Sequence, residues 1–527
     1  MRAGVSRAAG VVALATLMSR FFGLARDAIR AALIGAGWLS DAVNVAFKVP
    51  NLLRDLFAEG AFSGAFVPTL TAEREQSGDE AAWALFNRVL CTLAVYVGVV
   101  VALLIAFAPE LVQLLASRHF VEESGFFELT VMLVRLLAPF LFFISLAVAA
   151  MGALNVWGRF FVPALSPALQ NVLLVGGGVT LWKAGFGDAR AAVPWAVLLL
   201  IGGVLQFAAQ VPALLRAGWR PHWTPDVTLA TRGVREIVRR MGPVAGGMAA
   251  AHVCILINTK LATRVEGGDS FLYYAFRLVH LPVGLVGVAV GTAVLAQASR
   301  RAARGDRSGL QRTLGEALLV CLALAGPACA GLLTLGEPLA RMLFEWGTLD
   351  AEKSAAIGTT IRFYAPAVVF YCSVKVVAPV FYAQGRVHVP LVASLAAVAA
   401  NLACAFSLEP TMRYRGLALA VGAGQATNLA VLLLVAGRDF GLPGRYVWGR
   451  IARIALASVA CGAAAWFAAG LIPVEARFAR GLGATAVGGI VYLAVAVALR
   501  CPELATLRSL LRRSSGAADL DEAGDRP

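Results

Sequence analysis

The sequence predicts an all-α polytopic membrane protein with about 14 transmembrane helices, and three observations support this fold class. Hydrophobic residues make up 59% of the 527 residues and charged residues only 15%, which is too apolar a balance for a soluble protein of this length. Apolar stretches of about 20 residues, the length that crosses a hydrocarbon core, recur along the whole chain. The loops between them are short and leave no room for a large soluble domain.

The predicted spans are apolar runs that end at charged or at Pro- and Gly-containing residues. Arg2 and Arg7 precede the first run as in a signal peptide, but this run continues into a charged helix without a cleavage site, so we expect a retained span. In chain order we expect spans over residues 8–34, 38–68, 84–108, 128–154, 160–182, 191–215, 241–262, 270–298, 312–336, 354–383, 389–408, 416–436, 451–470 and 481–500.

A polar stretch that contains Pro and Trp interrupts the chain after the sixth span. Residues 46–48 and 275–277 are both Ala-Phe followed by a cation, at matching places on either side of it, and paired repeats are the usual construction of secondary transporters. We therefore expect an N-terminal lobe of six spans (1–216), a cytoplasmic linker (217–240), a C-terminal lobe of six spans (241–437), two further spans (438–513) and a disordered tail (514–527).

The net charge of +15 is explained by membrane topology rather than by nucleic-acid binding. The basic residues are scattered over short loops on alternate sides of the predicted membrane, and the termini and even-numbered loops hold most of them. Because cytoplasmic loops are enriched in Lys and Arg, we expect both termini in the cytoplasm.

The sequence lacks the motifs of several classes of functional site. The eight cysteines show no CxxC motif and no regular spacing, so neither a disulfide framework nor a metal site is indicated. P-loop, HExxH and GxSxG motifs are absent, so any transport would be secondary and we expect no cofactor. An integral membrane enzyme stays open, because carboxylates such as Asp41 and Glu59 are able to act in acid–base chemistry.

The strongest functional signal is the charge inside the first two predicted spans. An ionised side chain at the centre of a bilayer costs roughly 2.5–3.5 kcal/mol, so several together must line water, a ligand or each other. Cations carried into the membrane favour an anionic cargo, and phosphate accepts forked guanidinium hydrogen bonds well. The charged residues concerned are Arg20, Arg26, Asp27, Arg30, Asp41, Lys48, Arg54, Asp55 and Glu59.

Five polar residues of the second span share one stripe. Asp41, Asn44, Lys48, Asn51 and Asp55 follow one another at spacings of 3 or 4, so a helix places them on one face, which must point to the protein interior. The alternative reading is a neutralised ion-pair network that only holds helices together.

In the first span, Arg20 and Asp27 are seven residues apart and share a face, whereas Arg26 lies about 120° away. Asp27 can offset only one arginine, and Arg277 adds a cation from the eighth span, so the deep part of the site is expected to stay cationic. Lys375 is alone in an apolar span and either lines a cavity or snorkels to an interface.

Two further patterns lie in the second half. His252 and His280 are interpreted as structural, with proton coupling as the alternative. Gly287 and Gly291 form a small-xxx-small pair, which predicts close helix packing.

Specific motifs then resemble a known family. SRFFGLARDA at 19–28, AFKVPNLLR at 46–54 and FAEGAFSGAFVP at 57–68 closely resemble the MurJ (MviN) family of lipid II flippases. Weaker similarity continues through residues 155–160 and 374–382, so the resemblance covers nearly the whole chain. It implies the architecture of the multidrug/oligosaccharidyl-lipid/polysaccharide exporter superfamily, with two six-helix lobes around a central cavity plus two C-terminal helices.

The resemblance also implies an activity. Family members move lipid II, the undecaprenyl-diphosphate-linked peptidoglycan precursor, from the cytoplasmic to the periplasmic leaflet of the inner membrane for cell-wall synthesis. Lipid II is then the expected partner, a contact with the cell-wall synthesis machinery stays open, and we expect a monomer that binds no nucleic acid.

Family positions assign roles to residues of this chain. The resemblance implies diphosphate binding by Arg20, Arg26, Arg54 and Arg277, and cavity support or gating by Ser19, Asp27, Asp41, Lys48, Asn51, Glu59 and Lys375. The chain departs from the family pattern at Phe276 and His280, where acids are common.

Two alternatives to lipid II flipping stay open. An exporter of another polyprenyl-diphosphate-linked glycan, or a multidrug exporter, would share the fold, but a site for cationic drugs should be acidic. A membrane glycosyltransferase or phosphatase would change its substrate covalently, whereas a flippase would not.

Overall fold

The computed structural model describes residues 20–58, 61–441 and 444–503. Within these ranges the regular structure is helical and no strand occurs. Eleven of the described helices are long and apolar enough to cross a membrane. The chain is therefore an all-α multi-pass membrane protein, as predicted, whereas the count of fourteen spans stays a prediction.

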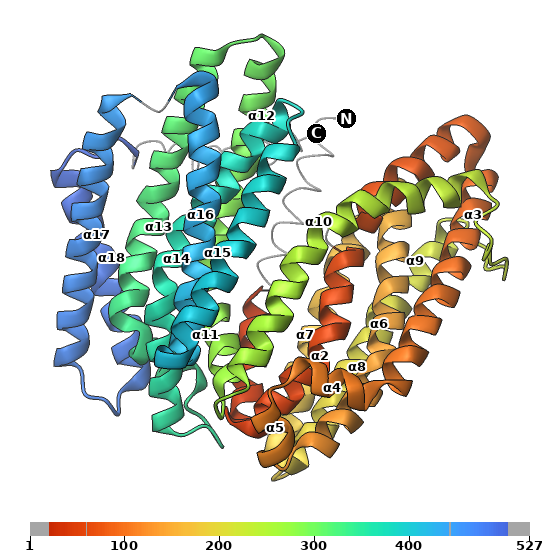
Figure 1. Ribbon diagram of the computed structural model, residues 1–527, viewed down its shortest axis with the longest axis horizontal. Helices are drawn as coiled ribbons and strands as arrows, with labels where there is room; N and C mark the ends of the chain where they lie inside the picture. Colours follow the sequence, from red (N-terminus) through yellow and green to blue (C-terminus); the bar gives the residue numbers. More distant parts are fainter. Residues whose placement is uncertain (1–19, 59–60, 442–443, 504–527) are drawn as a thin grey trace, which may run out of the picture. The chain divides into compact units, whose positions relative to one another are not determined.

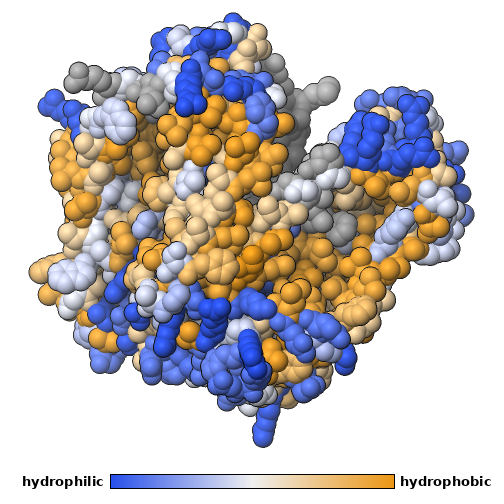
Figure 2. Space-filling view, in the orientation of Figure 1, coloured by the Kyte–Doolittle hydropathy of each residue, from blue (hydrophilic) through white to orange (hydrophobic). Residues whose placement is uncertain are grey.

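The chain forms two compact units. Unit 1 comprises Met1–Ser270 with Phe344–Asp350, and unit 2 comprises Phe271–Leu343 with Ala351–Pro527. In both units, hydrophobic residues cover the middle of the helices and hydrophilic residues gather at the ends (Figure 2), which is the pattern that a bilayer imposes. The predicted lobe boundaries stay a prediction.

Unit 1 is built around the long helix α6 (Phe127–Val156), which packs against its neighbours α2, α3 and α8 and is the most buried of the candidate spans. The other helices of unit 1 cover residues 20–34, α2 (Trp38–Ala58), α3 (Ala61–Ala106), α4 (Ala108–Leu115), α5 (Arg118–Glu123), α7 (Phe161–Lys183), α8 (Ala189–Ala208), α9 (Val211–Arg216) and α10 (Arg232–Ala262), labelled from α2 onwards in Figure 1.

The second predicted span differs from the structure at its end. The expected helix over 38–68 ends as α2 at Ala58, and the residues from Ala61 belong to α3. Pro68 lies inside α3 and does not end it. The break comes at Gly78, whose φ of 86° is readily adopted only by a residue without a Cβ. α3 therefore consists of two helical segments.

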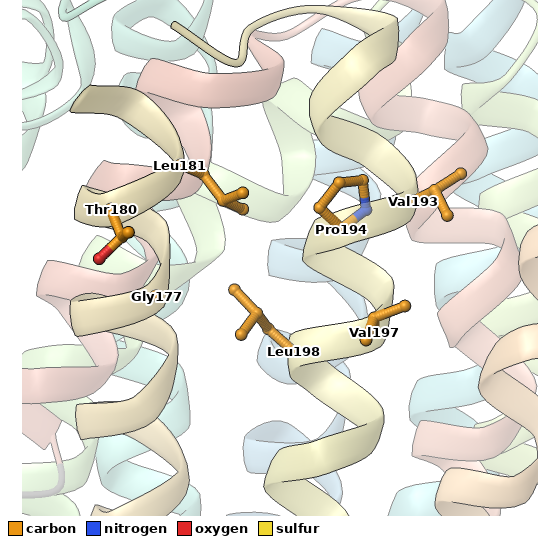
Figure 3. Close-up of a pocket in the computed structure, with 7 residues that line it drawn as sticks. All are labelled: Gly177, Thr180, Leu181, Val193, Pro194, Val197 and Leu198. Atoms are coloured by element: carbon orange, nitrogen blue, oxygen red, sulfur yellow. The ribbon is translucent and has the colours of Figure 1, made fainter. Parts of the chain in front are cut away.

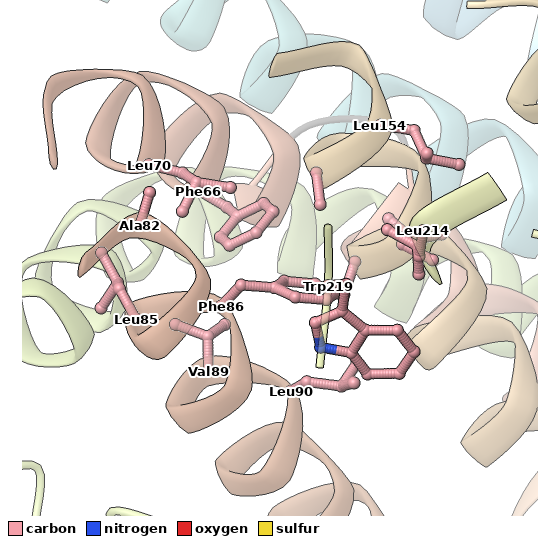
Figure 4. Packing of buried hydrophobic residues seen from close by; sticks show 14 of the residues in the cluster. Phe66, Leu70, Ala82, Leu85, Phe86, Val89, Leu90, Leu154, Leu214 and Trp219 are labelled. Carbon is pink, nitrogen blue, oxygen red and sulfur yellow. The ribbon is translucent and has the colours of Figure 1, made fainter. Parts of the chain in front are cut away.

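A hydrophobic cluster joins α3, α6 and the segment after α9. Phe66 and Phe86 are fully buried in it, and Leu154, Leu214 and Trp219 complete its centre (Figure 4). Burial of large aromatic side chains stabilises each by about 1.5–3 kcal/mol, so this cluster fixes how the start of the linker sits on α3.

The most extensive helix packing among the described residues of unit 2 joins α15 with α16, α14 with α16, α12 with α14, and α17 with α18. Its elements are most of α11 (Gly268–Pro282), η1 (Val283–Gly287), α12 (Val288–Ala303), α13 (Arg307–Phe344), α14 (Ala351–Ala383), α15 (His388–Met412), α16 (Tyr414–Phe440), α17 (Arg445–Leu471), η2 (Ala479–Gly483) and α18 (Ala484–Ala498).

The predicted close packing at Gly287 and Gly291 is confirmed. A Cβ on Gly291 would lie 2.5 Å from the backbone oxygen of Lys375 in α14, and one on Gly287 would lie 2.9 Å from the Lys375 Cδ. Both positions therefore require glycine for α12 and η1 to approach α14 this closely.

Candidate functional site

Three hydrogen bonds hold the guanidinium of Arg26, one of the predicted phosphate ligands. Its Nε and Nη2 both donate to Asp27 Oδ1, at 3.0 and 2.8 Å, and its Nη1 donates to Asn171 Oδ1 of α7 at 3.0 Å. The Arg26 side chain is 18% exposed and that of Asp27 only 1%. The guanidinium is thus held in one orientation while part of it stays accessible.

Arg30, one turn further along the same helix, has a structural role that the sequence did not assign. Its Nη2 donates to the backbone oxygen and the hydroxyl of Ser40, both at 3.2 Å, and to Asn44 Oδ1 at 2.7 Å. Arg30 is buried, so these bonds join the first described helix to α2.

Asp41 binds the first turn of α11. Its Oδ1 accepts the backbone N–H of Ser270 at 2.8 Å and the Ser270 hydroxyl at 2.6 Å, and Asn44 Nδ2 donates to the same hydroxyl at 3.3 Å. Asp41 is completely buried. A buried carboxylate needs such charge-assisted donors, because desolvation alone would be costly.

Lys48 pairs with Asp269, which lies just before the predicted span over residues 270–298. Its Nζ lies 3.1 Å from Asp269 Oδ1 and 3.3 Å from Oδ2, and Asp269 belongs to the first turn of α11. The partners are 221 residues apart in the chain, so no local spacing identifies them.

Exposure rises along the polar stripe of α2. Asp41 and Asn44 are buried, Lys48 and Asn51 are half-buried, and Arg54, paired with Asp55 at 2.7 Å, has a side chain that is 34% exposed. The stripe therefore faces the interior in its first half and opens outward toward Arg54. Arg20 is half-buried at the start of the described chain, whereas Ser19 and Glu59 lie outside the described residues.

The predicted cations of unit 2 have aromatic and glycine neighbours. Arg277 is exposed, donates from Nη2 to the Tyr273 hydroxyl at 3.0 Å and lies 4.8 Å from the centre of that ring. Lys375 is also exposed, with its aliphatic chain against Gly287.

The two departures from the family pattern lie together. The rings of Phe276 and His280 are 3.8 Å apart between centres, and His280 also contacts the ring of Tyr371 at 5.2 Å. An aromatic cluster therefore occupies the positions where the family often has acids.

A groove of about 450 Å³ lies between α7 and α8, away from these charges. Gly177, Thr180, Leu181, Val193, Pro194, Val197 and Leu198 line it (Figure 3), and the Thr180 hydroxyl is bonded within its own helix to Gly176. None of these seven side chains is charged, so the groove is no site for a diphosphate. Among the described residues, no group of three or more His, Cys, Asp or Glu is arranged to hold a metal ion.

Known proteins resemble this chain over most of its length. The sequence model of the family described as "Lipid II flippase MurJ" matches residues 30–476. The chain is 34% identical to a lipid II flippase MurJ of Burkholderia cenocepacia over 80% of this chain and 81% of that protein. It is 31% identical to a probable lipid II flippase MurJ of Rhizobium meliloti, over 97% of both chains.

Solved structures share the fold. A structure titled "Lipid II flippase MurJ, inward closed conformation" superimposes with a TM-score of 0.77 at 23% identity, covering 93% of this chain and 98% of that one. An inward-facing MATE family transporter of the MOP superfamily gives 0.66 at 15% identity, over 83% and 95%. The family match over most of the chain and the two relatives show that this protein belongs to the lipid II flippase MurJ family.

Proposed function

We propose that this protein flips lipid II from the cytoplasmic to the periplasmic leaflet of the inner membrane by alternating access, as a secondary-type transporter that leaves the lipid chemically intact. The observation that carries the proposal is a set of three half-buried cations on the first two described helices of unit 1. In a member of this family, Arg26, Lys48 and Arg54 each lie beside an acid.

Arg26 and Arg54 are the proposed first contacts of the diphosphate. Each guanidinium donates to one oxygen of a neighbouring carboxylate and stays partly exposed. A diphosphate carries more acceptor oxygens than a carboxylate, so it can take over part of these bonds, and arginine cannot escape the charge by losing a proton. Asn171 keeps the Arg26 fork oriented during this exchange.

Asp41 and Lys48 are proposed gating residues. Both hold the first turn of α11, through Ser270 and Asp269, just before the chain passes from unit 1 into unit 2. A ligand shifts a conformational equilibrium only through different affinities for its states, so the diphosphate must bind best in a state where these bonds are rearranged.

The remaining family assignments keep their proposed roles. Arg20 and Arg277 are assigned to the diphosphate, and Ser19, Asp27, Asn51, Glu59 and Lys375 to support or gating of the cavity. Both termini are proposed to lie in the cytoplasm, with the N-terminal lobe, linker and C-terminal lobe at 1–216, 217–240 and 241–437.

The test is the accessibility of lipid II to an outside probe in cells depleted of this protein and supplied with one variant at matched membrane level. Wild type and Arg118→Ala are expected to restore outward lipid II, and Arg26→Ala is not. Arg118 is the matched control because it also forms a 2.7 Å arginine–carboxylate pair, with Glu122, on an exposed helix.

Unchanged outward lipid II in depleted cells that lack any other flippase would contradict the proposed substrate. A covalently altered lipid, found by mass spectrometry after incubation with the purified protein, would favour a membrane transferase or phosphatase.

A further inference from the structure

The segment between α9 and α10 lies along the side of α3. This segment, residues 217–231, is called the linker coil. Near its start the buried Trp219 donates its indole N–H to Asn87 Oδ1 at 2.7 Å. Asn87 Nδ2 in turn donates to the backbone oxygen of Arg220 at 2.8 Å. The coil appears beside α3 in Figure 1, and Trp219 lies in the hydrophobic cluster of Figure 4.

The contacts continue further along α3. Thr92 Oγ1 accepts the backbone N–H of Asp226 at 2.8 Å, and the Tyr96 hydroxyl donates to the backbone oxygen of Val227 at 2.9 Å. Cys91 adds a weak bond to the backbone oxygen of His222. Polar side chains of one helix thus satisfy successive backbone groups of an irregular segment.

These contacts carry the coil past the last charged residue of α3. From Val89 to Ala106 the helix has no charged residue, and Arg88 immediately precedes this stretch. Tyr96 lies eight residues after Arg88, which corresponds to about 12 Å along a helix axis. Irregular backbone near membrane depth is stable only where its polar groups have protein partners, and α3 supplies them here.

The outer face of the coil combines an aromatic tip with cations. Trp223 is 70% exposed and Val227 51%, in contrast to Trp219 at 7%. Arg220 is exposed on the same segment, Arg216 is exposed at the end of α9, and Arg88 is exposed next to the Asn87 contact. Trp at an interface with neighbouring Arg is the combination that suits the headgroup region of a bilayer.

The single acid of the coil is hydrogen-bonded within its own turn. Asp226 accepts the backbone N–H groups of Ala230 and Thr231, at 2.9 and 2.7 Å. These bonds lower the pKa of the Asp226 carboxyl below its ordinary value. Asp226 therefore stays anionic within its turn, and the exposed Arg88, Arg216 and Arg220 outnumber it three to one.

We propose that the linker coil is a membrane-interface anchor for anionic phospholipids. Trp223 and Val227 insert among the headgroups, and Arg88, Arg216 and Arg220 bind phosphates of the same leaflet. This inference does not depend on which lipid the protein transports.

The first test measures depth. A spin label is attached to Trp223→Cys or Val227→Cys in a background where the two partly exposed cysteines, Cys329 and Cys404, are alanine. In nanodiscs with phosphatidylglycerol, both labels are expected to be several-fold more accessible to oxygen, relative to a water-soluble nickel complex, than a label at Ser308→Cys. Ser308 is exposed at the start of α13 in unit 2. Equal nickel accessibility at all three positions would overturn the proposal and favour a soluble partner for this face.

The second test measures the headgroup. Arg88, Arg216 and Arg220 are replaced by Gln, and the label at position 223 reports burial. The phosphatidylglycerol fraction needed for half-maximal burial should then rise severalfold, because each basic residue near an anionic surface contributes roughly fivefold in affinity. The control replaces Arg300, Arg304 and Arg307, three exposed arginines of unit 2, and should leave that fraction unchanged. A burial that is identical in phosphatidylcholine alone would refute the anionic lipid.

Discussion

The cations assigned to the candidate site in unit 1 and in unit 2 make different contacts. Arg26, Lys48 and Arg54 each contact a carboxylate at 2.7–3.1 Å. Arg277 instead lies over the Tyr273 ring, and Lys375 packs its chain on glycine. Carboxylates thus contact the three cations of unit 1, and an aromatic ring and a glycine are among the neighbours of the two cations of unit 2.

This difference has a consequence for binding. In unit 1 an arriving phosphate has to compete with acids already in place, so its affinity depends on the geometry of the fork as well as on charge. At Arg277 the phosphate would meet a cation held by an aromatic ring, where charge alone contributes more. Substitutions that keep charge but lose geometry should therefore separate the two units.

The largest expected effect is loss of flipping by Arg26→Ala and Arg54→Ala, with only partial rescue by lysine. At Arg277, lysine should restore most of the activity, because the point charge is retained. The measurement is outward lipid II at matched protein level. Full activity of both alanine variants would contradict the proposed diphosphate contact in unit 1.

Arg26→Ala also removes two hydrogen bonds to the buried Asp27, and breaking a buried pair costs about 3–5 kcal/mol in comparable cases. The double variant Arg26→Ala with Asp27→Asn removes that penalty. We expect it to recover the melting temperature but not flipping. Recovery of both would show that Arg26 acts only through stability.

The next effect concerns the pair of Lys48 and Asp269. Lys48→Met and Asp269→Asn should each lower the melting temperature. The double variant should lose less stability than the sum of the two single losses. The expected coupling is about 0.5–3 kcal/mol, as for contacting charged groups. Simple additivity would mean that the 3.1 Å contact contributes nothing in the folded protein.

A smaller effect is expected from packing in unit 2. Gly291→Ala places a methyl group against the Lys375 carbonyl and should destabilise the protein by about 1–3 kcal/mol. Gly331→Ala in α13 meets no atom within 4 Å and serves as the control. Thermal unfolding in detergent compares the two, and equal melting temperatures would contradict the close approach.

The smallest expected effect is a pH-dependent loss of stability on replacing one turn aspartate in each unit, and the two units should respond alike. Asp226 in unit 1 accepts two backbone N–H groups, and Asp306 in unit 2 accepts the Gly309 N–H and the Ser308 hydroxyl. These bonds hold the pKa of both carboxyls below the ordinary 3.8. Each contributes stability at neutral pH that is lost as pH falls through the lowered pKa. Asp226→Asn and Asp306→Asn should therefore lower the melting temperature slightly at pH 7 and not at strongly acidic pH; a constant difference would contradict these bonds.

Much of the fold was predictable because spans are read from local apolar runs, and α6, α7 and α14 begin and end within a few residues of the predictions. The polar stripe of α2 also followed from spacing. The partners of Lys48 and Asp41 did not, because they lie more than 200 residues away in the chain. Likewise, nothing local showed that the linker coil is bonded to α3 rather than free in water.

The most direct test of the central claim is a competition experiment in which native mass spectrometry detects lipid II bound to the purified protein. Undecaprenyl diphosphate should displace lipid II from wild type, and undecaprenol should not. The Arg26→Ala variant should bind undecaprenyl diphosphate and undecaprenol weakly and without discriminating between them. If undecaprenol competes as well as the diphosphate, then the arginines of unit 1 do not recognise phosphate and the proposed mechanism is wrong.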